Sequence, residues 1–197
     1  MRLPRSAQDE QPWLVRELAS DFTLDEVWEF PITADASKGE TFRSFCQLED
    51  AARGEPLSGP AEWLVQFRLL LGKLGLDRAS NQLPIPGCTE TSLRERLKPE
   101  DRQPVPELDA RFPFRMVYDR DTERLIEFSN GSVHGLLHLS WARKTDTLNA
   151  PRMAVYVKPR GWFGRMYMDL IYPFRVLVVY PAIMRASKLR WERRQLS

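Results

Sequence analysis

The two histidines of the chain, His134 and His138, are the residues whose type and spacing first suggest chemistry. On a helix, a spacing of four residues would bring both imidazoles together as metal ligands. The segment 133–141 instead alternates between apolar or small side chains and others, which predicts a β-strand. On a strand the imidazoles share a face but stand about 13 Å apart, four rises of about 3.3 Å, whereas zinc ligands lie about 2 Å from the ion. We therefore expect no metal at this pair, and no other cofactor.

Other roles for the two histidines stay open. They can be structural groups that hydrogen-bond within the fold, or polar groups in a pocket, where an imidazole can act as a general base near neutral pH. No Ser–His–Asp or Cys–His pairing follows from the spacing. We expect a protein that is not an enzyme, with a cyclase- or hydrolase-like reaction at His134 or His138 as an alternative.

A second candidate set is apolar and shares one parity on its predicted strands. It consists of Phe112, Phe114, Met116, Tyr118, Leu137, Trp141 and Met153. These side chains are either ordinary core or the lining of a cavity for an apolar ligand, for which flexible Met and aromatic side chains are suited. A third set, Lys158, Arg160 and Arg165, surrounds the expected start of the last helix, where it is either a solvated turn or an anion site.

The elements that must position these residues follow from periodicity and turn residues. A strand is expected within 21–32, followed by helices at 41–53 and 61–74. Residues 77–110 form a long connector, with a short helix from Ser92 and Glu95 as its capping-box partner. Whether this connector is a lid or a plain link stays open.

The rest of the chain predicts four strands and a final helix. The strands are expected at 112–118, 125–128, 133–141 and 153–158, with turns at 119–121 and 130–131. Their alternation favours an antiparallel sheet with one solvent-exposed face. The last helix is expected from 162 to about 194 with a kink at Pro173, although 176–180 fits a strand equally well.

Composition limits the classes of protein. The chain has 197 residues and a formal net charge of +2, which gives no reason to expect nucleic acid as a partner. Two cysteines without a metal-binding spacing favour a cytoplasmic protein. The longest apolar run, 176–184, is far shorter than the roughly 20 residues of a membrane span. We expect a polar lead-in at 1–20 and a single domain at 21–197, with a homodimer or docking onto a redox domain as one use of the apolar run.

The order of elements resembles the START-like superfamily, also called SRPBCC or helix-grip, in which a curved sheet wraps a long C-terminal helix. Three segments, 130–141, 153–161 and 164–181, are similar to the signature of one bacterial family of unknown function in that superfamily, found alone or fused behind a nucleotide-sugar epimerase-like domain. The resemblance covers roughly residues 20–190. It implies an α+β fold and a cavity for a hydrophobic small molecule, lipid or polyketide-like, between sheet and helix. This chain has Val176 where the family pattern has a histidine.

Overall fold

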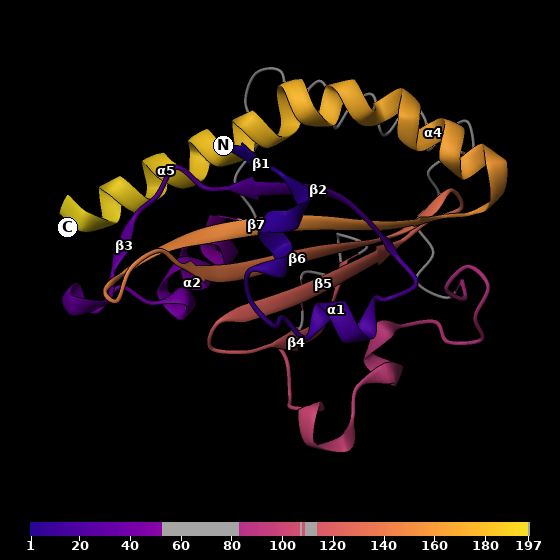
Figure 1. The fold of residues 1–197 in the computed structure, drawn as a ribbon, viewed down its shortest axis with the longest axis horizontal. Coiled ribbons are helices and arrows are strands. Elements are labelled where there is room, and N and C mark those ends of the chain that lie inside the picture. Colours follow the sequence, from indigo (N-terminus) through magenta and orange to yellow (C-terminus); the bar gives the residue numbers. More distant parts are fainter. Residues whose placement is uncertain (53–82, 107, 109–113, 197) are drawn as a thin grey trace.

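The computed structural model describes residues 1–52, 83–106, 108 and 114–196, and it has an α+β fold. The described residues form a curved antiparallel sheet in the order β1-β2-β7-β6-β5-β4, with β3 paired to the start of β7 (Figure 1). The strands are β1 (Arg2–Leu3), β2 (Thr23–Glu29), β3 (Ala34–Asp35), β4 (Phe114–Asp119), β5 (Glu123–Ser129), β6 (Val133–Arg143) and β7 (Leu148–Pro159). The four strands expected after residue 111 and the turns between them are therefore confirmed.

Helices flank this sheet. They are α1 (Val15–Leu18), α2 (Phe42–Ala51), α4 (Gly161–Phe174) and α5 (Tyr180–Leu196), and short 3₁₀ helices span Arg5–Asp9, Ala36–Lys38, Leu93–Arg96 and Pro99–Asp101. The expected helix at 41–53 is confirmed, and Thr41 and Ser44 cap its start reciprocally. The predicted capping box of Ser92 and Glu95 is also present. The helix expected at 61–74 lies outside the described residues.

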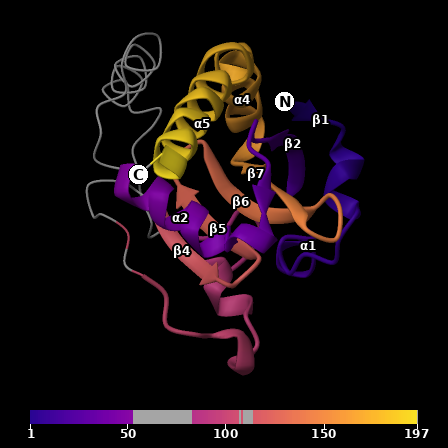
Figure 2. The same cartoon turned by 90° about the vertical axis from the view of Figure 1, so that its left-hand side faces the viewer.

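The C-terminal helix runs along one face of the sheet as a continuous, curved rod (Figures 1 and 2). Helices α4 and α5 are joined by a π-helical turn, Arg175–Val179, so the strand alternative for 176–180 is wrong. The wide turn comes directly after Pro173, which has no N–H to donate to the regular ladder. The interruption predicted at this proline therefore takes the form of a wider helical turn.

Both faces of the sheet are covered, and the expectation of one solvent-exposed face is wrong. Strand β6 shows why, because its even positions carry His134 and His138 and yet both side chains are fully buried. The odd positions contact the C-terminal helix and α2 in one apolar cluster. The even positions face a second cluster built with the N-terminal residues and the segment 83–97. The stretch expected as a polar lead-in supplies Trp13 and Val15 to this second cluster.

A β-bulge in β4 changes the side on which one candidate residue lies. The pairing of β4 with β5 shifts between Met116 and Tyr118, so that two consecutive residues, Val117 and Tyr118, both join the cluster away from the helix. Strict alternation had placed Tyr118 with Phe114. That placement is wrong, because the extra residue reverses the parity beyond the bulge.

Two glycines allow close approaches around the helix-facing side. A Cβ atom on Gly135 of β6 would lie 2.1 Å from the ring of Phe128, which therefore packs directly over the strand. A Cβ atom on Gly164 of α4 would lie 2.1 Å from the carbonyl oxygen of Ser132. The start of the C-terminal helix thus rests directly against the backbone of the β5–β6 turn.

Candidate functional site

His138 belongs to a buried hydrogen-bonded network on the side of the sheet away from the C-terminal helix. Its Nε2 lies 3.0 Å from Oε2 of Glu123, and its Nδ1 lies 2.9 Å from the amide nitrogen of Gln8. Glu123 also accepts from the Tyr118 hydroxyl at 2.7 Å and from the backbone N–H of Leu14 at 3.1 Å. The His138 imidazole is therefore hydrogen-bonded at both ring nitrogens, to Gln8 on one side and to Glu123 on the other.

The ionisation of this network follows from its partners. Burial raises the pKa of Glu123, but the hydrogen bond and electrostatic attraction of His138, together with hydrogen bonds from Tyr118 and the Leu14 backbone, outweigh that effect, so the pKa lies below its ordinary value. Burial and the Glu123 charge raise the pKa of Tyr118 well above its ordinary value. At neutral pH the site therefore holds a carboxylate and a neutral phenol.

His134 forms a similar acid–histidine pair four residues away along β5 and β6. Its Nε2 lies 3.3 Å from Oε2 of Glu127, and the same oxygen accepts the backbone N–H of Leu93 at 2.9 Å. The other carboxylate oxygen accepts the Ser92 hydroxyl and lies 3.3 Å from Arg115. Each of the two glutamates on β5 therefore joins one histidine of β6 to one covering segment of irregular backbone.

These contacts favour the structural role among those open for the histidines. Both imidazoles are fully buried, and each carboxylate partner is already occupied by three or more donors. A general base must reach its substrate's proton directly or through one water. The geometry instead lets Glu123 hold α1 and Glu127 hold the 3₁₀ helix Leu93–Arg96 against the sheet.

The spacing of acidic residues and histidines in the sequence indicates this network, although the alternation of apolar and polar residues does not. Glu123 and Glu127 flank the buried Leu125 at spacings of two, so they share its face on β5. Their spacing of four equals that of His134 and His138 on the neighbouring antiparallel strand. Two acid–histidine pairs across adjacent strands were therefore open to inference once the face was known to be covered.

A third buried carboxylate lies on the opposite side of the sheet. Glu26 accepts from the indole nitrogen of Trp28 at 3.0 Å, and Arg175 of the π-helical turn lies 3.3 Å from its other oxygen and also donates to Asp25. Burial raises the pKa of Glu26, and the Trp28 hydrogen bond and the Arg175 charge offset this only in part. This ion pair fastens the C-terminal helix to β2.

The three basic candidates for anion binding do not gather around one point. Lys158 pairs with Asp21 and lies 5.6 Å from the ring centre of Phe22. Arg160 donates to Ser129 and to the carbonyl oxygens of Asn130 and Pro84, so it ties the 83–106 segment to the β5–β6 turn. Arg165 is exposed on α4. Two of the three are thus engaged by the protein itself.

The apolar candidate set is divided between the faces of the sheet. Leu137, Trp141 and Met153 belong to the cluster beneath the C-terminal helix. Phe114 is half-buried and makes an edge contact with Phe128, whereas Met116 is buried. Tyr118 lies on the other side, as described above, and Phe112 lies outside the described residues. Whether the helix-facing members bind a ligand stays a prediction.

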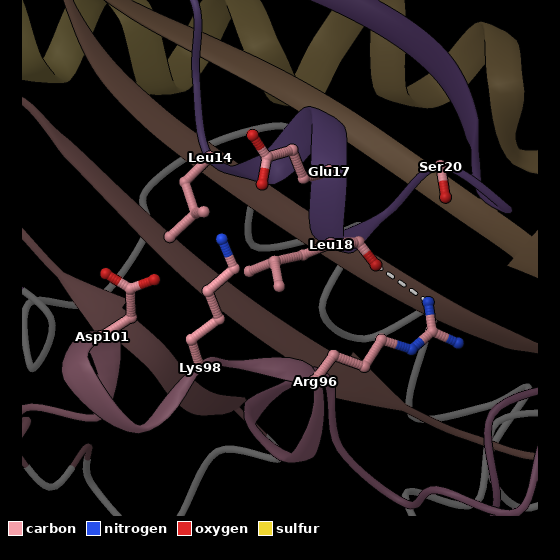
Figure 3. Close-up of a pocket in the computed structure, with 7 residues that line it drawn as sticks. All are labelled: Leu14, Glu17, Leu18, Ser20, Arg96, Lys98 and Asp101. Carbon is pink, nitrogen blue, oxygen red and sulfur yellow. Dashed lines mark hydrogen bonds between the residues drawn. The ribbon is translucent and has the colours of Figure 1, made fainter.

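A pocket of about 230 Å³ opens on the side of the sheet away from the C-terminal helix (Figure 3). It is lined by Leu14, Glu17, Leu18, Ser20, Arg96, Lys98 and Asp101. Its charges balance, and the guanidinium of Arg96 is already engaged by the Leu18 carbonyl oxygen and by Asp21. The volume is below the roughly 300–1,000 Å³ that is usual for small-molecule sites. This hollow therefore does not define a ligand class.

Fold and site together define an α+β domain whose buried acid–histidine pairs and helix-to-sheet ion pair hold covers on both faces of one sheet. A family model described as "Protein of unknown function (DUF2867)" matches residues 18–182, and the chain belongs to this family. Neither the curated proteins nor the solved structures contain a match to the chain.

Proposed function

We propose that this protein binds a hydrophobic small molecule, such as a lipid or polyketide-like compound, between the sheet and the C-terminal helix, as the START-like resemblance implies. The observation that supports the proposal is that several apolar side chains of this interface are only partly buried. Half-buried apolar side chains from the sheet and from the helix pack at the border of the buried cluster, and they include Phe128, Leu137, Ile171, Val176, Val179 and Ile183. Apolar surface that is neither fully covered by protein nor polar favours an apolar ligand.

The end of the interface between α2, α5 and the sheet indicates where the ligand would not lie. Trp141 contacts Phe42, Phe45 and Trp191, and its ring centre lies 6.0 to 6.4 Å from theirs. These aromatic side chains are buried and occupy the space between α2, α5 and the sheet. The proposed ligand therefore lies toward β4 and β5, beside Phe128 and Leu137, and not at Trp141.

Titration with cis-parinaric acid, an apolar fluorescent fatty acid, tests the proposal. The wild-type protein is expected to bind about one molecule with increased fluorescence. Leu137→Trp adds volume to the helix-facing side of β6 and is expected to weaken binding roughly tenfold. Val179→Phe adds volume from the helix side and is expected to act in the same direction.

Leu189→Trp is the matched control, because Leu189 is exposed on α5 and its replacement changes the same side-chain type. It is expected to leave the affinity unchanged. Circular dichroism establishes that each variant is folded. The proposal is wrong if the folded wild type binds no parinaric acid and carries no apolar compound in native mass spectra. It is also wrong if Leu137→Trp and Val179→Phe bind as tightly as the control.

A further inference from the structure

The outer side of the C-terminal helix carries large apolar side chains in one row. Trp162, Met166, Leu170 and Leu177 are 71%, 48%, 58% and 74% exposed, and we call them the apolar ridge. Their spacings of four, four and seven residues place them on one side of a helix. At 1.5 Å per residue the ridge is roughly 22 Å long. Exposed apolar side chains gathered in this way mark an interaction surface.

The same helix stands out by length and composition. Among the described residues, Gly161–Leu196 is the one helix long and apolar enough to cross a membrane, and 17% of its apolar window is buried. Its inner side nevertheless packs on the sheet through Tyr167 and Met168, and Arg175 joins it to Glu26. A helix fastened along one side can lie in the plane of a membrane surface with its free side inserted, without crossing it.

The charge of this segment is opposite to that of the rest of the chain. Residues 161–197 contain seven Arg or Lys and two Asp or Glu, whereas the whole chain has a net charge of only +2, so residues 1–160 are net negative. Arg165 is exposed within the length of the apolar ridge, and Arg185 and Lys188 are exposed eight and eleven residues beyond its end, on α5 of the same helix. Cations next to exposed apolar side chains complement an anionic lipid surface.

A second copy of the chain fits the same surface less well. If two ridges packed against each other in parallel, Arg165 of each copy would approach the same residue of the other. In an antiparallel pairing of the two ridges, Arg165 of one copy would lie opposite residue 174 of the other and would meet no acidic partner there. Either arrangement brings together two helices that each carry seven Arg or Lys and two Asp or Glu, and this like net charge opposes association.

We propose that the apolar ridge is a docking surface for a bilayer that contains anionic lipids, with the helix lying in the membrane plane. The ridge enters the boundary between headgroups and acyl chains, and Arg165, Arg185 and Lys188 contact lipid phosphates. This inference rests on the outer side of the helix alone and does not depend on the ligand proposed for its inner side.

Sedimentation of the full chain with vesicles tests this proposal. The protein is expected to bind vesicles of phosphatidylcholine that contain phosphatidylglycerol, and to bind pure phosphatidylcholine more weakly. Leu177→Glu removes the most exposed ridge side chain and is expected to weaken binding roughly tenfold. Arg165→Gln combined with Arg185→Gln is expected to weaken binding to the anionic vesicles and to leave the weak binding to neutral vesicles unchanged.

Leu196→Glu is the matched control, because it adds the same charge at the exposed end of the same helix, outside the ridge. It is expected to retain most of the binding. The proposal is overturned if the wild type does not bind the anionic vesicles, or if Leu177→Glu binds like Leu196→Glu. It is also overturned if light scattering shows a dimer that Leu177→Glu dissociates, because a second copy would then occupy the ridge. Parinaric acid binding measured in parallel keeps this result separate from that of the ligand proposal.

Discussion

The two faces of the sheet are covered by different kinds of chain and are held by different forces. Beneath the C-terminal helix the contacts are mainly apolar and aromatic, and the ion pair of Glu26 and Arg175 is one of the polar exceptions on this face. The opposite face is covered by short helices and irregular segments, and there Glu123 and Glu127 accept backbone N–H groups of the cover. The same strands supply side chains to both faces.

The contrast follows from backbone hydrogen bonding. A long helix satisfies most of its own N–H and C=O groups, so it can rest on a sheet through side-chain packing. Short helices and loops bring N–H groups that have no acceptor within their own helical turn, such as those of Leu14 and Leu93, into a buried interface. A buried carboxylate that accepts these groups, and is itself supported by a histidine, removes the cost of burying them.

The largest effect is expected on the aromatic side. Trp141→Ala removes a buried ring that contacts Phe42, Phe45 and Trp191, and it is expected to lower the free energy of unfolding by about 3–5 kcal/mol. Urea denaturation measures this change. Trp162→Ala removes an equal side chain from the exposed ridge and is the control. Equal losses for the two variants would contradict the packing described for Trp141.

On the polar side, Glu123→Gln keeps the shape of the side chain and removes its charge. We expect the free energy of unfolding to fall by about 1–3 kcal/mol at neutral pH, because donors from three segments lose a charged acceptor. Urea denaturation of the wild type, this variant and Glu17→Gln, an exposed control, measures the effect.

The pH dependence of the same variant has a defined sign. The pKa of Glu123 is lowered in the folded protein, so its stabilising effect is present above the unfolded value of about 4.3 and is lost as the pH falls through the folded pKa. The difference between wild type and Glu123→Gln should therefore stay nearly constant from pH 7 to about pH 5 and shrink as the pH falls below about 4.3. A difference that stays constant with pH would show that the carboxylate charge does not hold α1.

The contact between the C-terminal helix and the β5–β6 hairpin gives an effect of similar size. Gly164→Ala places a methyl group against the Ser132 carbonyl oxygen and is expected to cost about 1–3 kcal/mol, although alanine favours a helix. Gly131→Ala is the control, because a Cβ atom there meets nothing within 4 Å. Thermal unfolding of both variants measures the difference. A melting temperature for Gly164→Ala at or above the wild type would show that the helix can move away from the turn.

The smallest effect is expected on the outer side of the helix. Leu177→Glu changes an exposed side chain, and the free energy of unfolding should stay within about 0.5 kcal/mol of the wild type. Chemical denaturation without lipid measures this. A large loss of stability would mean that the ridge already packs against protein in solution.

The fold was predictable where local signals agree. Alternation indicated strands β4 to β7, apolar side chains at three- and four-residue steps indicated α2, and a capping box indicated the 3₁₀ helix at Leu93. The covered second face was not predictable in the same way, because His134 and His138 have the polarity of solvent-facing positions. Their burial depends on Glu123 and Glu127 and on covering segments far away in the sequence.

Other differences between the predicted and observed structure have local causes, which the alternation of residues along a strand does not reveal. The bulge at Val117 adds one residue to β4 and turns Tyr118 toward Glu123. The basic residues Lys158 and Arg160 follow each other closely in sequence, but they bind different partners because the chain leaves the sheet and enters the helix between them. The sequence therefore shows that these residues are charged, but it does not show which groups they contact.

The π-helical turn at 175–179 determines how α5 is rotated about the helix axis relative to α4. It lets Arg175 reach Glu26 while Trp191, further along, meets Trp141. Deleting one residue there would convert the wide turn to an ordinary one and rotate α5 by about 100° relative to α4. Homologous chains should therefore vary in the loops around this helix far more readily than in its residue count between Gly161 and Trp191.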